Sequence, residues 1–457
     1  MALLDSTDPR PIHFVGIAGA GMSSLAELFL RRGVPITGCD ANPGGAEDLR
    51  RLGVAVTAHD PAHVAGARAL VVTSAMPKDH PELVRARELG IPVIRRAEAL
   101  GEVTSDRELV GIAGTHGKTT TTVMTAAALA AAGRDPTVLV GGRVAAWGGN
   151  LLLGGDRLYV VEADEYDRSF LTLTPTVAVV NNIEADHLDI YTDIADIKRA
   201  FAQFVGGARS IALCADDAGA NSLATPSSAE VIRFGIDSPD ARVLAKDLAL
   251  DAAGSSYRLW FDDELLGDVR LQVPGRHNVL NSLAALSSGL ALGADVRGMA
   301  EGLATYSGVE RRFQRLGEAR GVAVVDDYAH NPGKVAAVVA TARIAYPDRR
   351  LIVAFQPHLF TRTRDFAREF GTSLAGADEV FLTEIYPARE QPIAGVTSQL
   401  VADAVVRAGG TVAWRGERAD LAAALASSVR DGDLVLMVGA GDITKSGPEL
   451  LARLGGA

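Results

Sequence analysis

The residues best suited to chemistry lie in the stretch GTHGKTT at residues 114–120, between an apolar run and a helical one. A nucleoside triphosphate requires converging backbone amides, a helix N-terminus and a cation, because its phosphates carry several negative charges. Gly117 allows close approach of the backbone, Lys118 can reach the β- and γ-phosphates, and the Thr119 hydroxyl can ligate Mg²⁺. We therefore predict a triphosphate-binding loop made of Gly114, Thr115, His116, Gly117, Lys118, Thr119 and Thr120.

This loop is a shortened form of the Walker A pattern, which requires a glycine where the chain has Ile112. A glycine turn that only packs a helix on a sheet would explain the glycines. It would not explain the sequence Lys-Thr-Thr at the start of the helix.

Two further stretches end apolar runs with acidic residues. LYVVEADEYD supplies Glu162, Asp164 and Glu165, and VVNNIEADHLD supplies His187 among Glu184, Asp186 and Asp189. A carboxylate at the end of a neighbouring strand commonly completes the Mg²⁺ site of such a loop. One of the first three acids is therefore expected to bind Mg²⁺. For His187, a second metal site and an ordinary polar role stay open.

The stretch VGIAGAGM at residues 15–22 begins with the same five letters as the triphosphate-loop stretch VGIAGTHGK. Gly16 and Gly21 fit the dinucleotide pattern Gly-x-Gly-x-x-Gly, but Ala18 occupies the middle position, where glycine permits close approach of a pyrophosphate. Asp40 follows the next apolar run, about where an acid would bind a ribose. NAD, another diphosphate and a packing turn without ligand all stay open. Ser74 ends a further apolar run and is another candidate contact.

These residues must be positioned by α/β units, because apolar strand-like runs alternate with Ala- and Leu-rich helical runs along most of the chain. At 457 residues the chain is too long for one core. We expect a Rossmann-like domain at 1–105, a central P-loop domain with a mostly parallel sheet at 106–318, and a C-terminal Rossmann-like α/β domain at 319–457. The helices after the two glycine turns are expected to close at Gly33 and Gly133, and residues 241–273 alternate like antiparallel strands.

Composition excludes several classes of function. The formal charge of -11 disfavours binding to nucleic acid or to an anionic membrane. The two cysteines, Cys39 and Cys214, lie far apart and exclude a disulfide framework. The N-terminus lacks the pattern of a signal peptide, and no run reaches the roughly 18 apolar residues of a membrane span. A cytoplasmic protein is therefore expected.

Seven stretches together resemble the motifs of the Mur ligases, the ATP-dependent enzymes that build the peptide of bacterial peptidoglycan. They are GTHGKTTTT, VVEADEYDRSF, NNIEADHLD, GRHNVLNSLAA, RRFQRLG, VVDDYAHNP and FQPHLFTRTRDF. The resemblance runs nearly end to end. It implies an N-terminal UDP-sugar domain, a central ATPase domain and a C-terminal domain that closes over the site.

The same resemblance implies roles for individual residues. For Mg²⁺ it implies Thr119, Glu162 and His187, and for catalysis Lys118, Glu162, His187, His330 and Arg312. For the base and ribose of ATP it implies His277, Asn278, Asn281 and Asp327. For the substrate it implies Gly16, Gly19, Ala20, Gly21, Met22, Asp40, Ser74, His358 and Arg362.

Each of these roles has a structural alternative. Asn278 and Asn281 could cap a helix. Arg312 and its neighbour Arg311 could be a solvated pair, and His358 and Arg362 could belong to a surface loop.

The opening HFVGIAGAGMSSLAE is most similar to the member that joins L-alanine to the lactyl carboxylate of UDP-N-acetylmuramate. That reaction proceeds through an acyl phosphate and gives ADP and phosphate. An enzyme joining a murein tripeptide to the same nucleotide is the nearest alternative. A nicotinamide oxidoreductase and a non-catalytic nucleotide-binding protein are further ones. Two positions depart from the family pattern, Ala18 and Asn331, so a role is not carried over to Asn331.

Overall fold

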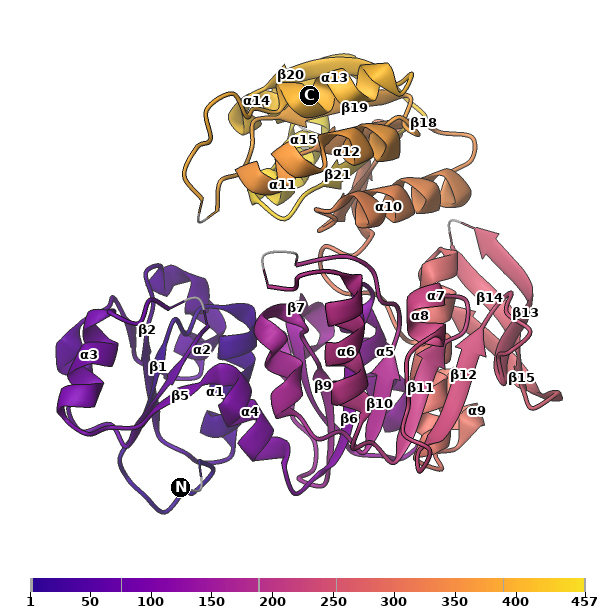
Figure 1. Cartoon of the computed structure of the whole chain (residues 1–457). Coiled ribbons are helices and arrows are strands. Elements are labelled where there is room, and N and C mark those ends of the chain that lie inside the picture. The colour runs from indigo at the N-terminus through magenta and orange to yellow at the C-terminus, as the bar shows by residue number, and fades with distance from the viewer. Residues whose placement is uncertain (1–2, 75, 188–189, 252, 389, 456–457) are drawn as a thin grey trace. The chain divides into compact units, whose positions relative to one another are not determined.

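The computed structural model describes residues 3–74, 76–187, 190–251, 253–388 and 390–455. Its contacts divide the chain into two compact units. The first comprises Met1–Leu248, Ser256–Leu271 and Asn278–Tyr306, and the second comprises Ala249–Ser255, Gln272–His277 and Ser307–Ala457. Two sheets belong mainly to the first unit and a third sheet belongs to the second (Figure 1).

The first sheet is parallel and has the strand order β3-β2-β1-β4-β5. Its strands are β1 (Ile12–Val15), β2 (Ile36–Cys39), β3 (Val56–Thr57), β4 (Ala69–Val72) and β5 (Val93–Arg95). All residues of β1 and β4 are buried, as expected for a parallel sheet. After β1 the chain adds β2 and β3 on one side of that strand, and then β4 and β5 on its other side. The carboxyl ends of β1 and β4 therefore form a topological switch point, where ligands of α/β proteins bind.

Helices connect these strands. They are α1 (Ala20–Arg31), η1 (Pro43–Ala46), α2 (Glu47–Arg51), η2 (Pro61–Val64), α3 (Pro81–Glu88) and α4 (Arg96–Thr104). The chain leaves α1 through Gly33, whose φ of 82° lies in the left-handed region that glycine favours, as the sequence predicts. Arg32, which follows α1, donates from Nη2 to the Gly155 carbonyl at 2.8 Å and so ties this domain to the next one.

The second sheet has ten strands in the order β15-β14-β13-β12-β11-β10-β6-β9-β7-β8. They are β6 (Glu108–Ala113), β7 (Thr137–Val144), β8 (Gly149–Leu152), β9 (Leu158–Glu162), β10 (Val177–Val180), β11 (Ser210–Cys214), β12 (Glu230–Gly235), β13 (Val243–Asp251), β14 (Gly254–Phe261) and β15 (Glu264–Leu271). Strand β6 is parallel to both neighbours, β10 and β9, whereas β7 and β8 pair antiparallel.

The helices of this part follow the predicted α/β alternation. They are α5 (Lys118–Ala131), η3 (Ala145–Trp147), η4 (Tyr166–Thr172), α6 (Ile194–Val205), α7 (Ala218–Asn221), α8 (Arg276–Ala291) and α9 (Val296–Ala304). Helix α5 begins at Lys118, directly after Gly117, and the chain leaves it through Gly133 with φ of 75°.

The third sheet has the order β16-β17-β21-β18-β19-β20. Its strands are β16 (Gln314–Ala319), β17 (Val322–Asp327), β18 (Arg350–Phe355), β19 (Glu379–Thr383), β20 (Val412–Gly416) and β21 (Asp433–Val438). Only the pairing of β16 with β17 is antiparallel among the pairings of these strands. Its helical segments are α10 (Pro332–Ala345), α11 (Phe360–Asp365), α12 (Ala367–Leu374), α13 (Gln399–Arg407), α14 (Arg418–Ser428), η5 (Asp442–Lys445) and α15 (Ser446–Gly455).

The predicted fold class is confirmed, because the chain has the three-domain α/β fold with mostly parallel sheets. The division at 105/106 and 318/319 stays a prediction. Strand β16 pairs with β17 of the third sheet and runs across the second of these positions.

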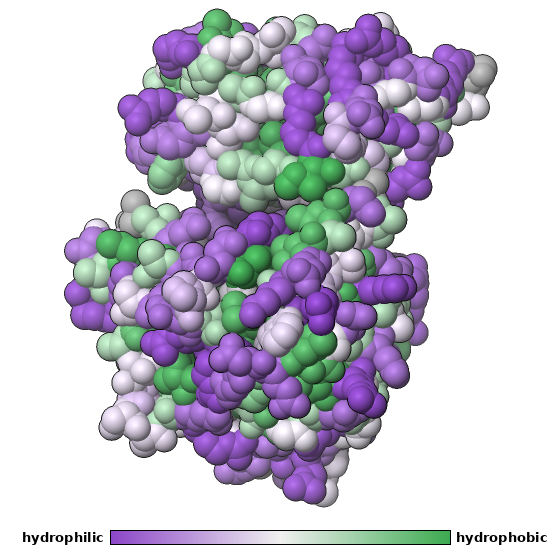
Figure 2. All heavy atoms as spheres, turned by 90° about the vertical axis from the view of Figure 1, so that its right-hand side faces the viewer, coloured by the Kyte–Doolittle hydropathy of each residue, from purple (hydrophilic) through white to green (hydrophobic). Residues whose placement is uncertain are grey.

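Among the described residues, no helix combines the length and the apolar character needed to cross a membrane. On the face that Figure 2 shows, hydrophilic residues (purple) are interspersed with hydrophobic ones (green). Large hydrophobic residues that are exposed, such as Leu265, Ile344 and Val406, lie on different elements.

Close packing of α9 on α5 generates a prediction. A Cβ at Gly302 of α9 would collide with the Ala127 carbonyl of α5. In an ordinary helix Gly→Ala stabilises by about 1 kcal/mol. We expect Gly302→Ala to lower the free energy of unfolding by about 1–3 kcal/mol instead, because overpacking outweighs propensity. Urea unfolding measures it, with Gly207→Ala as control, since a Cβ at Gly207 has no neighbour within 4 Å. An unchanged or raised urea midpoint for Gly302→Ala would contradict the packing described.

Candidate functional site

The carboxyl ends of three neighbouring parallel strands bring the predicted chemistry together. The glycine loop follows β6, Glu162 is the last residue of β9, and Asn181 and Asn182 follow β10. Because β6 pairs in parallel with both β9 and β10, these groups meet at one edge of the sheet. Helix α5 starts at the same edge, so its N-terminal backbone amides face the same region.

The glycine loop has a backbone that only glycine adopts readily. Gly114 has φ of 146° and Gly117 has φ of 79°. A Cβ at Gly117 would also collide with Oδ1 of Asn281 and lie 3.1 Å from Nδ2 of Asn181. Backbone therefore approaches these two amides without any intervening side chain.

A buried hydrogen-bond network holds the loop. The His116 backbone amide donates to Asn182 Oδ1 at 2.7 Å. The hydroxyl of Thr121 accepts from Asn181 Nδ2 at 2.9 Å and donates to Asn281 Oδ1 at 3.1 Å. The sequence analysis assigned no role to Asn181 and Asn182. Their signal was the pair of amides at the end of the strand run VAVVNN.

Lys118 forms an ion pair with Glu165. Its Nζ lies 2.6 Å and 2.9 Å from the two carboxylate oxygens and also donates to the Gly114 carbonyl at 2.7 Å. Burial alone would lower the pKa of Lys118, but Glu165 and Asp164 outweigh burial and raise it above its ordinary value. The cation predicted to bind phosphate is thus charged and is held by a carboxylate that is only 2% exposed.

The Thr119 hydroxyl and Glu162 form the predicted Mg²⁺ pair. Thr119 Oγ1 donates to Glu162 Oε1 at 3.0 Å, and Glu162 Oε2 accepts from the Gly141 amide at 2.7 Å. Hydroxyl and carboxylate oxygens are the donors that Mg²⁺ prefers. The donor set therefore fits the ion, and its binding here stays a proposal.

His187 lies at the same cluster. Its Nε2 is 3.7 Å from Glu165 Oε1, and its ring packs edge-on against Tyr166 at 5.1 Å between centroids. The backbone of His187 has a positive φ of 53°. Asp189, grouped with this histidine in the sequence analysis, falls outside the described residues.

The first glycine turn borders a separate pocket of about 480 Å³ at the switch point of the first sheet. Predicted residues that line it are Gly16, Gly19, Met22 and Asp40. Ala20 lines a neighbouring hollow of about 290 Å³ and its carbonyl accepts from Asn150 Nδ2 at 3.2 Å.

Asp40 braces the turn that it was predicted to accompany. Its Oδ2 accepts from the Ala18 amide at 3.0 Å and its Oδ1 from the Asn42 amide at 2.9 Å. Both carboxylate oxygens therefore already bind backbone amides. Ala18 itself lines the pocket, where its methyl group occupies the middle position of the glycine pattern.

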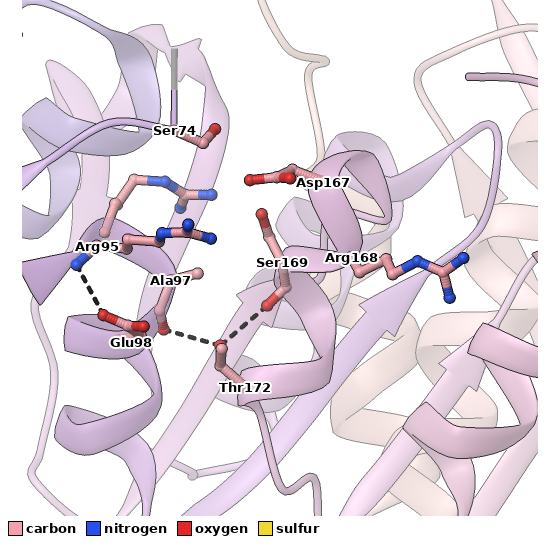
Figure 3. A pocket seen from close by; sticks show the side chains of 9 residues that line it. Ser74, Arg95, Ala97, Glu98, Asp167, Arg168, Ser169 and Thr172 are labelled. Atoms are coloured by element: carbon pink, nitrogen blue, oxygen red, sulfur yellow. Dashed lines mark hydrogen bonds between the residues drawn. The ribbon is translucent and has the colours of Figure 1, made fainter. Parts of the chain in front are cut away.

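Arginines adjacent to this turn were missed by the sequence analysis. An added Cβ at Gly21 would lie 3.1 Å from Nη1 of Arg96, so this guanidinium rests on the first turn of α1. Arg96 and Arg95 also line a pocket of about 160 Å³ with the predicted Ser74. Asp167 and Ser169 of η4 face Ser74 across it, whereas Arg168 points away (Figure 3). Two consecutive arginines between a strand and a helix, in IPVIRRAEAL, were the signal.

In the second unit, Asp327 and His330 follow β17. Asp327 accepts from the amides of Phe313 and Ala329, each at 2.7 Å, and burial raises the pKa of its carboxyl. Nδ1 of His330 donates to the Tyr328 carbonyl at 2.8 Å. Burial, with Lys334 and Arg362 nearby, holds the pKa of His330 well below its ordinary value, so the ring is neutral at pH 7.

Arg311 and Arg312 are not a solvated pair. Arg311 donates to the Gly439 carbonyl at 2.6 Å and lies 3.5 Å from Asp326, which is fully buried. Arg312 stacks over the ring of Tyr328, 5.4 Å from its centroid. The solvated alternative is therefore wrong for Arg311 and stays open for Arg312.

His358 and Arg362 lie together at the end of β18 and the start of α11. The two side chains are 3.4 Å apart, and His358 stacks on Tyr386 with 5.8 Å between ring centroids. Leu359, between them, has a positive φ of 73°.

Asn278 and Asn281 lie inside α8, which begins at Arg276, so neither caps that helix and the capping alternative is wrong. Both are 6% exposed. Nδ1 of His277 is 3.3 Å from the Thr341 hydroxyl.

These features define a P-loop nucleotide-binding protein with three α/β domains. Residues 11–108 match the Mur ligase family catalytic domain, residues 112–289 the Mur ligase middle domain, and residues 311–441 the Mur ligase glutamate ligase domain. The chain belongs to the Mur ligase family.

Relatives match over the full length. The UDP-N-acetylmuramate–L-alanine ligase of Acidothermus cellulolyticus is 44% identical, covering 99% of this chain and 98% of its own. That of Kineococcus radiotolerans is 46% identical, with 97% and 96% covered. Among solved structures, the UDP-N-acetylmuramate–alanine ligase of Thermotoga maritima has a TM-score of 0.84 at 28% identity, with 97% and 98% covered. A murein peptide ligase from Psychrobacter arcticus has a TM-score of 0.73 at 25% identity, with 98% and 99% covered.

The conformation of the glycine loop generates a second prediction. We expect Gly117→Ala to weaken binding of an ATP analogue at least about tenfold, because a side chain adds left-handed strain and a collision with Asn281. Calorimetry measures the dissociation constant.

Gly133→Ala is the matched control. Gly133 also has a positive φ, but an added Cβ there has no neighbour within 4 Å. Equal affinity losses in the two variants would show that strain alone, not the loop contact, is responsible.

Proposed function

We propose that this protein joins L-alanine to the lactyl carboxylate of UDP-N-acetylmuramate at the expense of ATP, a step in making peptidoglycan precursors. The observation that carries the proposal is the edge of the second sheet, where Lys118, Thr119 and Glu162 converge beside a helix N-terminus. The names of the full-length relatives support the choice of substrates.

The chemistry requires activation of a carboxylate. The lactyl carboxylate attacks the γ-phosphorus of ATP in line, the bond to the β-phosphate oxygen breaks, and an acyl phosphate and ADP form. The neutral amine of L-alanine then attacks the acyl carbon and loses a proton, and phosphate leaves as the amide forms. Mg²⁺ at Thr119 and Glu162 would supply charge neutralisation at the phosphates.

Lys118 changes partners in this proposal. In the structure it neutralises Glu165, which is buried and would otherwise be an uncompensated charge. When ATP binds, the ammonium contacts the β- and γ-phosphates and stabilises charge that develops during transfer. Glu165 and His187 remain at the edge of the cluster, 3.7 Å apart.

The UDP part is proposed to bind at the first turn. The N-terminus of α1 and the Arg96 guanidinium, which rests on Gly21, both favour a diphosphate. This proposal also includes the roles that the family resemblance implies for five residues of the second unit. They are Asp327, Arg312, His330, His358 and Arg362.

Two alternatives are less well supported. Murein-tripeptide ligation has a structural relative, but the full-length relatives at 44% and 46% identity are both named L-alanine ligases. A nicotinamide oxidoreductase would leave the P-loop without a function. The acid that would bind the NAD ribose, Asp40, already accepts hydrogen bonds from backbone amides at both carboxylate oxygens.

The direct test measures phosphate release from ATP and Mg²⁺ with UDP-N-acetylmuramate and L-alanine, the murein tripeptide or no amine. Release that depends on L-alanine, with the amide product identified by mass spectrometry, supports the proposal. Release with the tripeptide alone selects the alternative ligase. If neither amine drives phosphate release, ligation is unsupported.

Separate phosphate sites generate a third prediction. We expect Lys118→Ala to abolish phosphate release, because the γ-phosphoryl group loses its cation, while UDP-N-acetylmuramate binds with unchanged affinity. Circular dichroism checks the fold, because the variant leaves Glu165 unpaired. Loss of both properties in a folded variant would contradict the separation of the sites.

The position of Arg96 generates a fourth prediction. We expect Arg96→Ala to raise the KM for UDP-N-acetylmuramate about tenfold or more and to leave the KM for ATP unchanged, because a charge-assisted contact to the diphosphate is lost. Arg85→Ala is the control, since Arg85 is an exposed arginine of the same domain that pairs with Glu88. A matching rise in both variants would point to a loss of general surface charge.

A further inference from the structure

A second group of chemically active residues lies in the first domain, and none of its members has been assigned a role in the proposed ligation. Its members are His13, Cys39, His59, His63, His80 and Glu82. They come from β1, the end of β2, the η2 region and α3. One ligand atom from each of His13, Cys39, His63 and Glu82 lies within 4.8 Å of the others.

Glu82 is the centre of this group. Its carboxylate is completely buried, and its two oxygens lie 3.2 Å and 3.0 Å from the Cys39 sulfur. Nδ1 of His63 and Nδ1 of His59 each lie 3.7 Å from one of its oxygens. The Asp60 amide donates to it at 2.7 Å. A buried carboxylate is energetically unfavourable unless a cation compensates its charge.

Some ring nitrogens of the group lack a hydrogen-bond partner among the described residues. Nε2 of His13 and Nδ1 of His63 are buried and without a hydrogen bond. His13 is 1% exposed, and its other nitrogen, Nδ1, is fixed by the Thr37 hydroxyl at 2.8 Å. Thr37 therefore fixes the orientation of the ring and leaves Nε2 available for a ligand. Buried polar atoms without partners are uncommon in proteins and call for a partner such as a water molecule or a metal ion.

The Cys39 thiol already points at the carboxylate. Cys39 is fully buried, and its sulfur donates to the two oxygens of Glu82. A metal ion bound here would replace the thiol proton in this contact.

We propose that His13, Cys39, His63 and Glu82 form a structural site for Zn²⁺ or a similar divalent transition metal. One thiolate, two imidazoles and one carboxylate make a closed tetrahedral set of the type that zinc occupies. Tetrahedral zinc ligands lie roughly 3.3–3.8 Å apart, so the four side chains need only small movements to close around the ion. Nδ1 of His59, 3.1 Å from the Cys39 sulfur, would donate to the thiolate.

The location gives the site a role. Cys39 directly precedes Asp40, which braces the first glycine turn, and His59 lines the pocket beside that turn. The ion would fasten β1 and β2 to α3 and the η2 region behind this pocket. The proposal does not depend on the ligase reaction.

The test uses untagged full-length protein, stripped with a chelator and titrated with Co²⁺ and then Zn²⁺. We expect about one ion per chain and, for Co²⁺, the intense near-ultraviolet band of a cobalt–thiolate bond together with visible bands of tetrahedral cobalt. Zn²⁺ should displace the cobalt and remove both. Absence of the thiolate band, with no Zn²⁺ retained after dialysis, would overturn the proposal without any variant.

Variants identify the ligands. Cys39→Ser and His63→Gln should lower Zn²⁺ affinity at least about tenfold and Cys39→Ser should abolish the thiolate band. Cys214→Ser, at the other buried cysteine, and His80→Gln, at a neighbouring histidine outside the set of four, should leave both unchanged. Retention of the band in Cys39→Ser, or its loss in Cys214→Ser, would overturn the assignment.

Discussion

The rest of the structure depends on one electrostatic constraint. A chain with a formal charge of -11 must hold anionic phosphates by local groups, because its overall field repels them. Both glycine turns meet this constraint in the same way. Each follows a parallel strand, bends through a glycine of positive φ and starts a helix whose amides face the ligand region. The repeated five letters VGIAG reflect the repeated physical requirement.

The two turns differ in the side chains that contact them. At the second turn, Lys118 is paired with the buried Glu165 and Thr119 with Glu162, which arranges charge for phosphoryl transfer. At the first turn, Asp40 is committed to the backbone and Arg96 rests on the helix start. The first site therefore provides binding, and the second provides a cation, a hydroxyl and carboxylates for chemistry.

Much of this arrangement followed from the sequence, because glycine turns and buried strands have strong local signals. The α/β class, the closure of α1 and α5 at glycines and the P-loop after β6 were all predicted. Partner choice was not. The stretch EADE at residues 162–165 has three acids, and which of them contacts Lys118 depends on how the chain turns after β9. Asp167 and Arg168 adopt positive φ in that turn. The neighbours of Arg96 and the cluster around Glu82 join residues far apart in sequence, and no local pattern reports such contacts.

The claim most open to direct test is that two phosphate-bearing ligands occupy two independent sites. Calorimetry with UDP-N-acetylmuramate, before and after saturation with a non-hydrolysable ATP analogue and Mg²⁺, tests it. The account predicts that the sugar nucleotide binds the saturated protein with one-to-one stoichiometry and is not displaced by the analogue. Competition between the two ligands would contradict it, because it would mean that one glycine turn serves both.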